Sequence, residues 1–213
     1  MPSGYSLWLS PSGDAGQALT SLLSRLSERH ATPLFKPHTT LVADSLTPDV
    51  QLQELVSKTE QAVQEWKSKR AAGQRRPING DGGTDSGRLT LSFHDVRQGD
   101  LFYQCVLAAL VRDSDLVDLH QTIRRAYGTD SNPDAPVYFP HTSLVYGDLT
   151  REKKDQIIAE LKRGGEVEDL PEATEDGSKV KIVGQTGYIA DEILIVNTSG
   201  PTSEWDVLAR IAL

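Results

Sequence analysis

One short segment occurs twice in this chain, and the repetition restricts the fold to one built from two matching halves. Residues 37–42 read Pro-His-Thr-Thr-Leu-Val, and residues 140–145 read Pro-His-Thr-Ser-Leu-Val. When the chain is aligned from His38 and from His141, six of eleven successive positions are identical. A repeat of this kind indicates two similar structural units, each carrying one copy of the segment.

The distribution of apolar residues predicts that each unit combines strands with helices. The order strand, helix, histidine strand, helix, strand occurs twice and is followed by further strands. We therefore predict an α+β fold, a single bilobal domain over residues 1–213. Its two pseudo-symmetric lobes would each have a mainly antiparallel sheet and flanking helices, with the active-site cleft between them. Besides the second histidine strand, strands are expected near 5–10, 38–43, 88–96, 101–111, 178–188, 192–198 and 205–211, and helices near 14–29, after Thr47-Pro48, near 113–127 and after Thr150.

Two segments without periodicity separate these elements. Residues 71–87 are rich in glycine and polar residues, which predicts a flexible loop. Residues 164–177 are acidic and are expected to form a second loop.

The repeated motif suits acid and base chemistry on a phosphate. Residues i and i+2 of a strand share a face, so His38 projects with Thr40 and His141 projects with Ser143. An imidazole titrates near pH 6.5, so one ring can accept a proton from water while its twin donates one to a leaving oxygen. The two hydroxyls can donate hydrogen bonds to phosphate oxygens. A single His-x-Thr is more often structural, and only the pairing of two favours an enzyme.

Composition and missing motifs exclude several other classes of protein. The formal charge is −8, which disfavours a protein that holds a long polyphosphate backbone. Neither a P-loop nor a dinucleotide-binding glycine motif is present, and His-x-Thr lacks the additional ligands of a zinc or iron site. Cys105 is the only cysteine and lies in an apolar run, so we expect it to be buried and unpaired. No run of about 18 apolar residues is present, and the N-terminus lacks a secretory pattern, so we expect an intracellular protein.

The sequence also resembles a known family. The segments that carry the resemblance are Tyr-Ser-Leu-Trp at residues 5–8, Phe-Tyr-Gln-Cys-Val at 102–106, Pro-His-Thr-Ser-Leu-Val-Tyr at 140–146, and Trp205. They are similar to the cyclic phosphodiesterase branch of the 2H phosphoesterase superfamily, of the plant and fungal type. The resemblance implies hydrolysis of ADP-ribose 1″,2″-cyclic phosphate to ADP-ribose 1″-phosphate, and of nucleoside 2′,3′-cyclic phosphates to 2′-phosphates, downstream of tRNA splicing. It implies no metal and no organic cofactor.

Carried over by position, the resemblance makes His38 and His141 catalytic and Thr40 and Ser143 substrate-binding. It adds Tyr146 and Trp8 to the pocket, although both also have a packing interpretation. In a straight strand Tyr146 would point away from the His141 face, unless the chain bends before Gly147.

The resemblance also bears on partners and location. We expect a small-molecule cyclic nucleotide or ADP-ribose cyclic phosphate as the partner, no stable nucleic-acid partner, no membrane span and a monomer. We expect a cytoplasmic location, and the fungal relatives also allow association with the Golgi. The alternatives are an enzyme of this superfamily that processes or ligates RNA ends, and a nucleotide-binding module without catalysis.

Overall fold

The structure is a computed structural model, and it describes residues 4–43, 50–72, 88–129 and 137–213. Most of the loop predicted at 71–87 lies outside these ranges. The described helices are α1 (Gly13–His30), α2 (Leu52–Ala71), α3 (Ser114–Ala126) and α4 (Arg151–Arg163), with 3-10 turns η1 (Phe102–Gln104) and η2 (Thr202–Glu204). The strands are β1 (Tyr5–Leu9), β2 (Thr39–Val42), β3 (Leu89–Gln98), β4 (Val106–Leu110), β5 (His141–Val145), β6 (Val167–Asp169), β7 (Val180–Ile182), β8 (Gly187–Ala190), β9 (Glu192–Asn197) and β10 (Asp206–Ala212).

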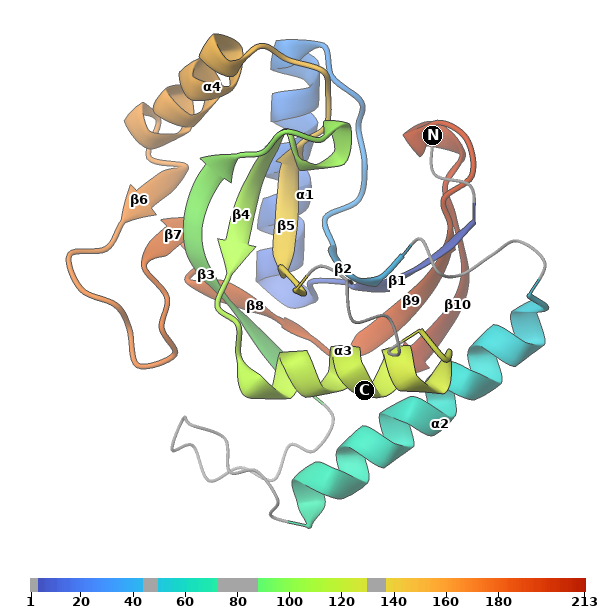
Figure 1. The fold of residues 1–213 in the computed structure, drawn as a ribbon. Coiled ribbons are helices and arrows are strands. Elements are labelled where there is room, and N and C mark those ends of the chain that lie inside the picture. The colour runs from blue at the N-terminus through green and yellow to red at the C-terminus, as the bar shows by residue number, and fades with distance from the viewer. Residues whose placement is uncertain (1–3, 44–49, 73–87, 130–136) are drawn as a thin grey trace.

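Eight of these strands form one curved antiparallel sheet in the order β10-β9-β1-β2-β5-β4-β3-β8. The two histidine strands, β2 and β5, are neighbours at its centre and are joined through one register pair, Thr39 with Thr142. In Figure 1, β3, β4 and β5 lie on one side and β9 and β10 on the other, with β1 and β2 between them. The predicted α+β fold with two antiparallel lobes is therefore confirmed, and the two lobes share one sheet.

The lobes do not correspond to successive halves of the chain. β9 and β10, the last strands in the sequence, pair beside β1 and complete the lobe that contains the N-terminal strands. β3 and β4, which come earlier, complete the lobe that contains β5. Each lobe has a strand–helix–histidine-strand unit at its centre, β1-α1-β2 in one and β4-α3-β5 in the other.

The helices cross between the lobes. α1 buries Leu19, Leu22 and Leu26 and packs on β5 and β8 of the opposite lobe. α3 packs on β2 and β3, and α2 covers α3 and reaches β10. Because each lobe is covered partly by a helix of the other, the apolar residues form one main core cluster. No described helix has the length and apolar character that crossing a membrane requires.

Local structure corrects two of the predicted boundaries. α2 begins at Leu52 and not after Thr47-Pro48, because the extended backbone of Gln51 immediately precedes it, and Thr47 and Pro48 lie outside the described residues. The strand expected near 101–111 begins only at Val106, because a 3-10 turn stabilised by the bond from Gln104 N to Leu101 O occupies its start. The hydroxyl of Thr150 caps α4 as predicted, accepting from the Lys153 amide.

The later part of the chain also contains more strands than expected. The segment predicted as an acidic loop, 164–177, includes β6, which pairs with β7. The single strand expected near 178–188 is divided into β7 and β8, with a turn between them in which Ile182 bonds Gln185.

We predict that the two lobes unfold together, because strands and helices are exchanged between them. Ile195 on β9 is fully buried and pairs with Leu7 on β1, so Ile195→Ala is expected to destabilise the protein by about 2–5 kcal/mol and Ile195→Val by about 0.5–1.5 kcal/mol. Urea unfolding followed by tryptophan fluorescence and by far-UV circular dichroism should give one coincident transition that moves to lower urea in both variants. Two separate transitions would contradict the prediction.

Candidate active site

All six residues predicted for the site line one cavity of about 260 Å³. β1 and β2 contribute one wall, and β5 and η1 contribute the opposite wall. The six predicted lining residues are Trp8, His38, Thr40, His141, Ser143 and Tyr146. The structure therefore brings together residues that are 138 positions apart in the sequence at their extremes, 146 − 8.

The two histidines are held by the same backbone contact. The Nδ1 atom of His38 lies 2.7 Å from the carbonyl oxygen of Lys36, and that of His141 lies 2.9 Å from the carbonyl oxygen of Phe139. A carbonyl oxygen can only accept, so Nδ1 carries the hydrogen in both rings. Nε2 is then the nitrogen that can accept a proton in each neutral imidazole.

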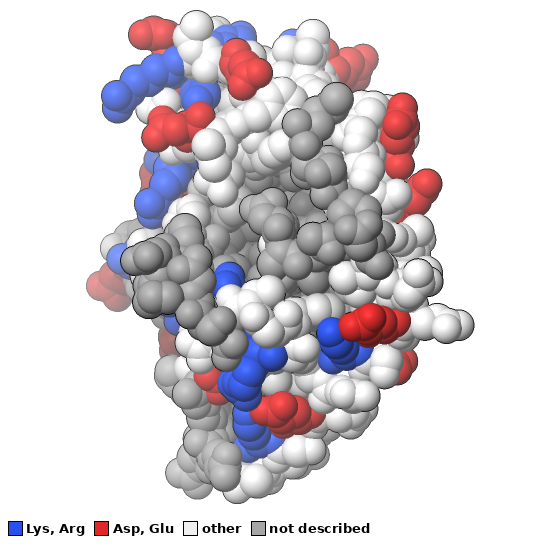
Figure 2. Space-filling view, turned by 45° about the vertical axis from the view of Figure 1, so that its right-hand side comes forward, with Lys and Arg blue, Asp and Glu red and all other residues white. Residues whose placement is uncertain are grey.

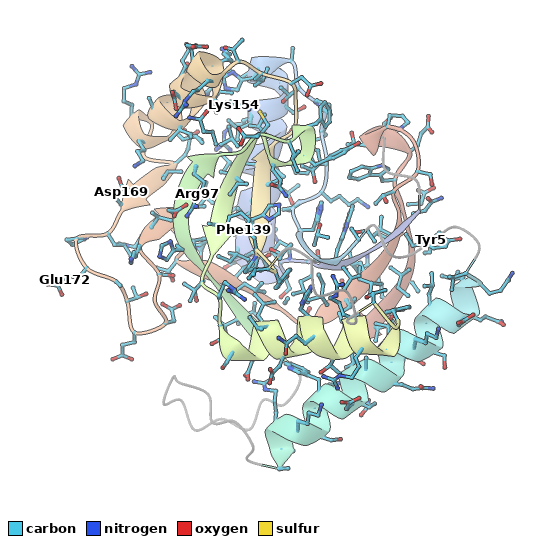
Figure 3. The ribbon with its side chains drawn as sticks, in the orientation of Figure 1. Tyr5, Arg97, Phe139, Lys154, Asp169 and Glu172 are labelled. Carbon is cyan, nitrogen blue, oxygen red and sulfur yellow. The ribbon has the colours of Figure 1, made fainter. Side chains whose placement is uncertain are left out.

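The surroundings of the two rings differ. His38 is 5 % exposed and its ring is stacked on Trp8, with centroids 3.6 Å apart. Burial lowers the pKa of His38 to about 4, the Lys36 carbonyl opposes this shift, and the nearby His141 adds to it. His141 is partly exposed and stacks on Phe139, which is labelled in Figure 3, with ring centroids 5.4 Å apart, and burial also lowers the pKa of His141. Both rings are therefore neutral at pH 7 in the ligand-free protein, and a bound anion would raise the pKa of each.

The two hydroxyls of the motifs are not equivalent. Thr40 lies opposite Trp8 in the β1–β2 ladder, and within the described residues its side-chain hydroxyl has no hydrogen-bond partner. Ser143 instead donates its hydroxyl hydrogen to the carbonyl oxygen of Tyr103 at 2.7 Å. In this arrangement Thr40 can donate to an anion directly, whereas Ser143 would first have to leave the Tyr103 carbonyl.

Tyr146 faces the cavity because β5 ends before it. The strand stops at Val145, and Gly147, with φ of 156°, donates its amide to the Phe102 carbonyl oxygen at 2.9 Å. The Tyr146 ring then stacks on Phe35 at 3.6 Å and places its hydroxyl 3.4 Å from Nε2 of His38. Burial raises the pKa of this phenol, so it keeps its hydrogen as a donor. The bend required by the sequence argument is present.

An aromatic wall completes the cavity and includes two residues that sequence reasoning did not assign to the site. Trp205 lies 5.6 Å from Trp8 and 5.8 Å from Tyr103 between ring centroids. Tyr103 reaches the cavity from η1, the segment that was expected to be a strand. Trp205 is among the residues that carry the family resemblance and stands at the start of the last expected strand, but it was given no role at the site.

The described lining of the cavity has no lysine, arginine, aspartate or glutamate. The imidazoles of His38 and His141 are therefore the groups of this lining that can become cationic near neutral pH. In the described part of the chain, no three histidine, cysteine or carboxylate side chains lie close enough together to hold a metal ion.

The remaining histidines and the cysteine lie away from this lining. Nε2 of His30 is 3.6 Å from a Glu160 carboxylate oxygen, and the His120 ring stacks on Tyr138 at 3.8 Å. His94 pairs with its half-buried neighbour Asp95. Cys105 is fully buried, as expected, and burial raises the pKa of its thiol.

Comparison with known proteins decides the family. A family model described as "Cyclic phosphodiesterase-like protein" matches residues 1–213. The chain belongs to this family. A curated relative named cyclic phosphodiesterase, from Arabidopsis thaliana, is 24 % identical over 151 residues, which cover 70 % of this chain and 68 % of that protein.

The chain is also similar to solved structures over its whole length. The chain matches LigT of E. coli in its apo form with a TM-score of 0.49 and 14 % identity, covering 100 % of this chain and 98 % of that chain. The structure of LigT with 3′-AMP matches with the same TM-score, identity and coverage.

We predict that His38 stays neutral well below the pH at which a free imidazole titrates, because burial against Trp8 lowers its pKa to about 4. Proton–nitrogen correlation spectra of the imidazoles should show the Nδ1–H form of His38 at pH 6, with the signal assigned by its loss in His38→Ala. Inorganic phosphate should raise the pH at which the ring becomes protonated. Titration of His38 above pH 6 without phosphate would contradict this prediction.

The same shift has a consequence for stability. The unfolded chain binds a proton at His38 near pH 6.5, and the folded chain binds it only near pH 4. The contribution of this group to stability is therefore complete above about pH 6.5 and decreases as the pH falls toward 4.

Proposed function

We propose that the protein is a metal-independent hydrolase of cyclic phosphodiesters. Its substrates would be ADP-ribose 1″,2″-cyclic phosphate, opened to ADP-ribose 1″-phosphate, and nucleoside 2′,3′-cyclic phosphates, opened to 2′-phosphates, as by-products of tRNA splicing. The observation that carries this proposal is the pair of histidines in one cavity, each with Nδ1 bonded to the carbonyl oxygen two residues before it. Membership of the cyclic phosphodiesterase-like family supports hydrolysis of a cyclic phosphodiester as the reaction class.

We propose different roles for the two imidazoles, because their surroundings differ. His38 is the more buried ring and burial lowers its pKa to about 4, so it stays neutral and accepts the proton of the attacking water at Nε2. His141 is partly exposed, becomes protonated when the anionic substrate binds, and donates that proton to the leaving ribose oxygen. The water oxygen forms a bond to phosphorus as the bond to the ribose oxygen breaks, and the net reaction adds one water. Exchange with solvent then restores both rings.

The lining favours a substrate with a single phosphate charge at the reaction centre. A cyclic diester carries one negative charge, which one imidazolium balances, whereas the monoester product carries more negative charge than the one proton held by the two imidazoles in this mechanism balances. This difference favours release of the product. The flat aromatic surfaces of Trp205 and Tyr103 offer stacking for the ribose or base.

The size of the cavity limits how much of the substrate it encloses. Its volume of about 260 Å³ is below the ~300–1,000 Å³ of pockets that bury a whole drug-sized ligand. We therefore expect the cavity to enclose the cyclic phosphate and its sugar. The rest of ADP-ribose or of a nucleotide would extend beyond it.

The surface is consistent with a small-molecule substrate. Figure 2 shows lysine and arginine side chains close to aspartate and glutamate side chains on the face that it draws. An RNA-binding protein usually has lysine and arginine residues clustered on one face, without interspersed acidic residues. We accordingly propose that the protein has no stable nucleic-acid partner, and we also propose that it is a cytoplasmic monomer. RNA-end processing or ligation and binding without catalysis are the alternatives that turnover experiments distinguish.

We predict that His38→Ala and His141→Ala each reduce kcat by about 10²-fold or more, the usual contribution of an acid or base catalyst. The assay should offer the four nucleoside 2′,3′-cyclic phosphates and ADP-ribose 1″,2″-cyclic phosphate, and should locate the phosphate in each product by ³¹P NMR. His94→Ala is the matched control, because His94 lies outside the cavity lining and should leave kcat unchanged. The rate should also survive EDTA.

Three outcomes would oppose the proposal. Near-normal hydrolysis by both cavity variants would remove the histidines from the mechanism. Binding of a 2′-phosphonucleotide without turnover of any cyclic phosphate would favour a binding module. Salt-sensitive affinity for RNA, with turnover only at RNA ends, would favour RNA processing or ligation.

We also predict that the two motif hydroxyls contribute unequally. The Thr40 hydroxyl is free to donate to the phosphate, so Thr40→Val should reduce kcat by roughly 10²-fold, as the loss of one oxyanion donor does. Ser143→Ala should reduce kcat less, because the Ser143 hydrogen is already bonded to the Tyr103 carbonyl oxygen. Equal losses in kcat for the two variants would show that Ser143 turns toward the phosphate when substrate binds.

A further inference from the structure

Three buried hydroxyls meet where the two histidine strands join. Thr39 Oγ1 lies 2.9 Å from Thr142 Oγ1 and 2.5 Å from the hydroxyl oxygen of Tyr188. Thr142 Oγ1 lies 3.1 Å from the same phenol oxygen. The two threonines are fully buried and Tyr188 is 3 % exposed, so water does not compete for these contacts.

The three hydroxyls satisfy one another completely. Each has one hydrogen to donate, and three contacts join three oxygens, so every hydroxyl can donate once and accept once around a closed ring. Burial raises the pKa of Tyr188 to about 12, so the phenol keeps its hydrogen throughout the neutral range. Loss of one member leaves the other two with an incomplete set of bonds in a dry interior, which is costly.

The position of this ring links it to the catalytic pair. Thr39 and Thr142 are the middle residues of the two His-x-Thr/Ser motifs, and alternation along a strand turns them to the sheet face opposite the cavity. They are also the register pair through which β2 and β5 are joined. Any change in their separation therefore moves His38 and His141 relative to each other.

Tyr188 contacts both threonines from a strand that is not adjacent to β2 or β5. It lies on β8, at the edge of the sheet and on the far side of β3, β4 and β5 from β2, yet its hydroxyl reaches Thr39. Gly187 lets β8 approach β3 closely, since a Cβ atom there would lie 2.2 Å from the Leu91 carbonyl oxygen. The Tyr188 ring also contacts Phe93 on β3, with centroids 6.0 Å apart.

We propose that Thr39, Thr142 and Tyr188 are positioning residues, whose hydroxyl ring sets the separation of the two catalytic imidazoles. This inference rests on the proposed function, because it concerns the same pair of histidines. None of the three residues lines the cavity, so their effect on the reaction is transmitted through the backbone of β2 and β5. A displacement of about 1 Å at a reacting group is enough to reduce turnover up to about 10²-fold.

The test compares two tyrosine-to-phenylalanine substitutions. Tyr188→Phe removes one hydroxyl from the ring and is expected to reduce kcat about 10-fold or more while KM changes less than about twofold. Tyr127→Phe is the matched control: its hydroxyl lies 2.7 Å from Thr59 Oγ1 and 2.8 Å from the Leu55 carbonyl oxygen, outside the cavity lining. The control should lose comparable stability in urea and retain kcat.

Two substitutions of Thr142 distinguish the effect of its hydroxyl from the effect of its side-chain shape. Thr142→Val keeps the shape and removes the hydroxyl, so it should behave like Tyr188→Phe, whereas Thr142→Ser keeps the hydroxyl and should retain most of the activity. If Tyr188→Phe does not fold, comparison of Thr142→Val with Thr142→Ser still tests the positioning role. A purely structural role predicts that Tyr188→Phe and Thr142→Val lose stability and keep kcat and its pH profile, and this result would overturn the proposal.

A second readout does not need turnover. His141 contributes to the pKa of His38, so His141→Ala should shift the imidazole titration of His38 in the otherwise unaltered protein. The same substitution in the Tyr188→Phe background should produce a different shift, because the rings are then differently separated. Failure of the proposed function would appear as no hydrolysis by the unaltered protein, whereas an identical shift in both backgrounds would overturn the positioning role alone.

Discussion

The contact between β2 and β5 is the constraint on which the rest of the structure depends. His38 immediately precedes β2 and His141 begins β5. The two strands form the centre of the sheet, and their ladder consists of one register pair, Thr39 with Thr142. Because this ladder between β2 and β5 is so short, side chains also join the two strands. The hydroxyls of Thr39 and Thr142 form a hydrogen-bonded ring with the hydroxyl of Tyr188. Helices of each lobe pack on strands of the other, so one core cluster shared between the lobes supports the cleft.

The described lining of the cleft is mostly buried or half-buried and holds no permanently charged side chain, and this determines the protonation of its two imidazoles. No described lining residue is a lysine, an arginine or a carboxylate, and the two imidazoles have lowered pKa values because they are desolvated. Such a site is neutral when empty and gains positive charge only when an anion enters. The stacked Trp8 and Phe139 rings keep the imidazoles oriented, and the Lys36 and Phe139 carbonyl oxygens fix which nitrogen carries hydrogen.

The features that the sequence predicted correctly are those with a local, repeated pattern. Alternation along a strand predicted that His38 and Thr40 share a face with His141 and Ser143, and all four line the cavity. Two predicted boundaries were wrong. The extended backbone at Gln51 lies where the helix was expected to have begun, and the 3-10 turn around Tyr103 lies where a strand was expected. Turns of this kind depend on a few backbone bonds that leave little trace in hydrophobic periodicity.

The sequence by itself determined that each motif histidine shares a strand face with a hydroxyl, because alternation along a strand fixes this whatever lies around the motif. Only the tertiary structure decided which strands complete each lobe, that Tyr146 turns to His38, and that Trp205 and Tyr103 close the cavity. It also decided that Tyr188 braces the middle threonines of both motifs. Contacts of this kind join residues far apart in the chain, and strand pairing and the curvature of the sheet, which spacing along the sequence does not encode, bring them together.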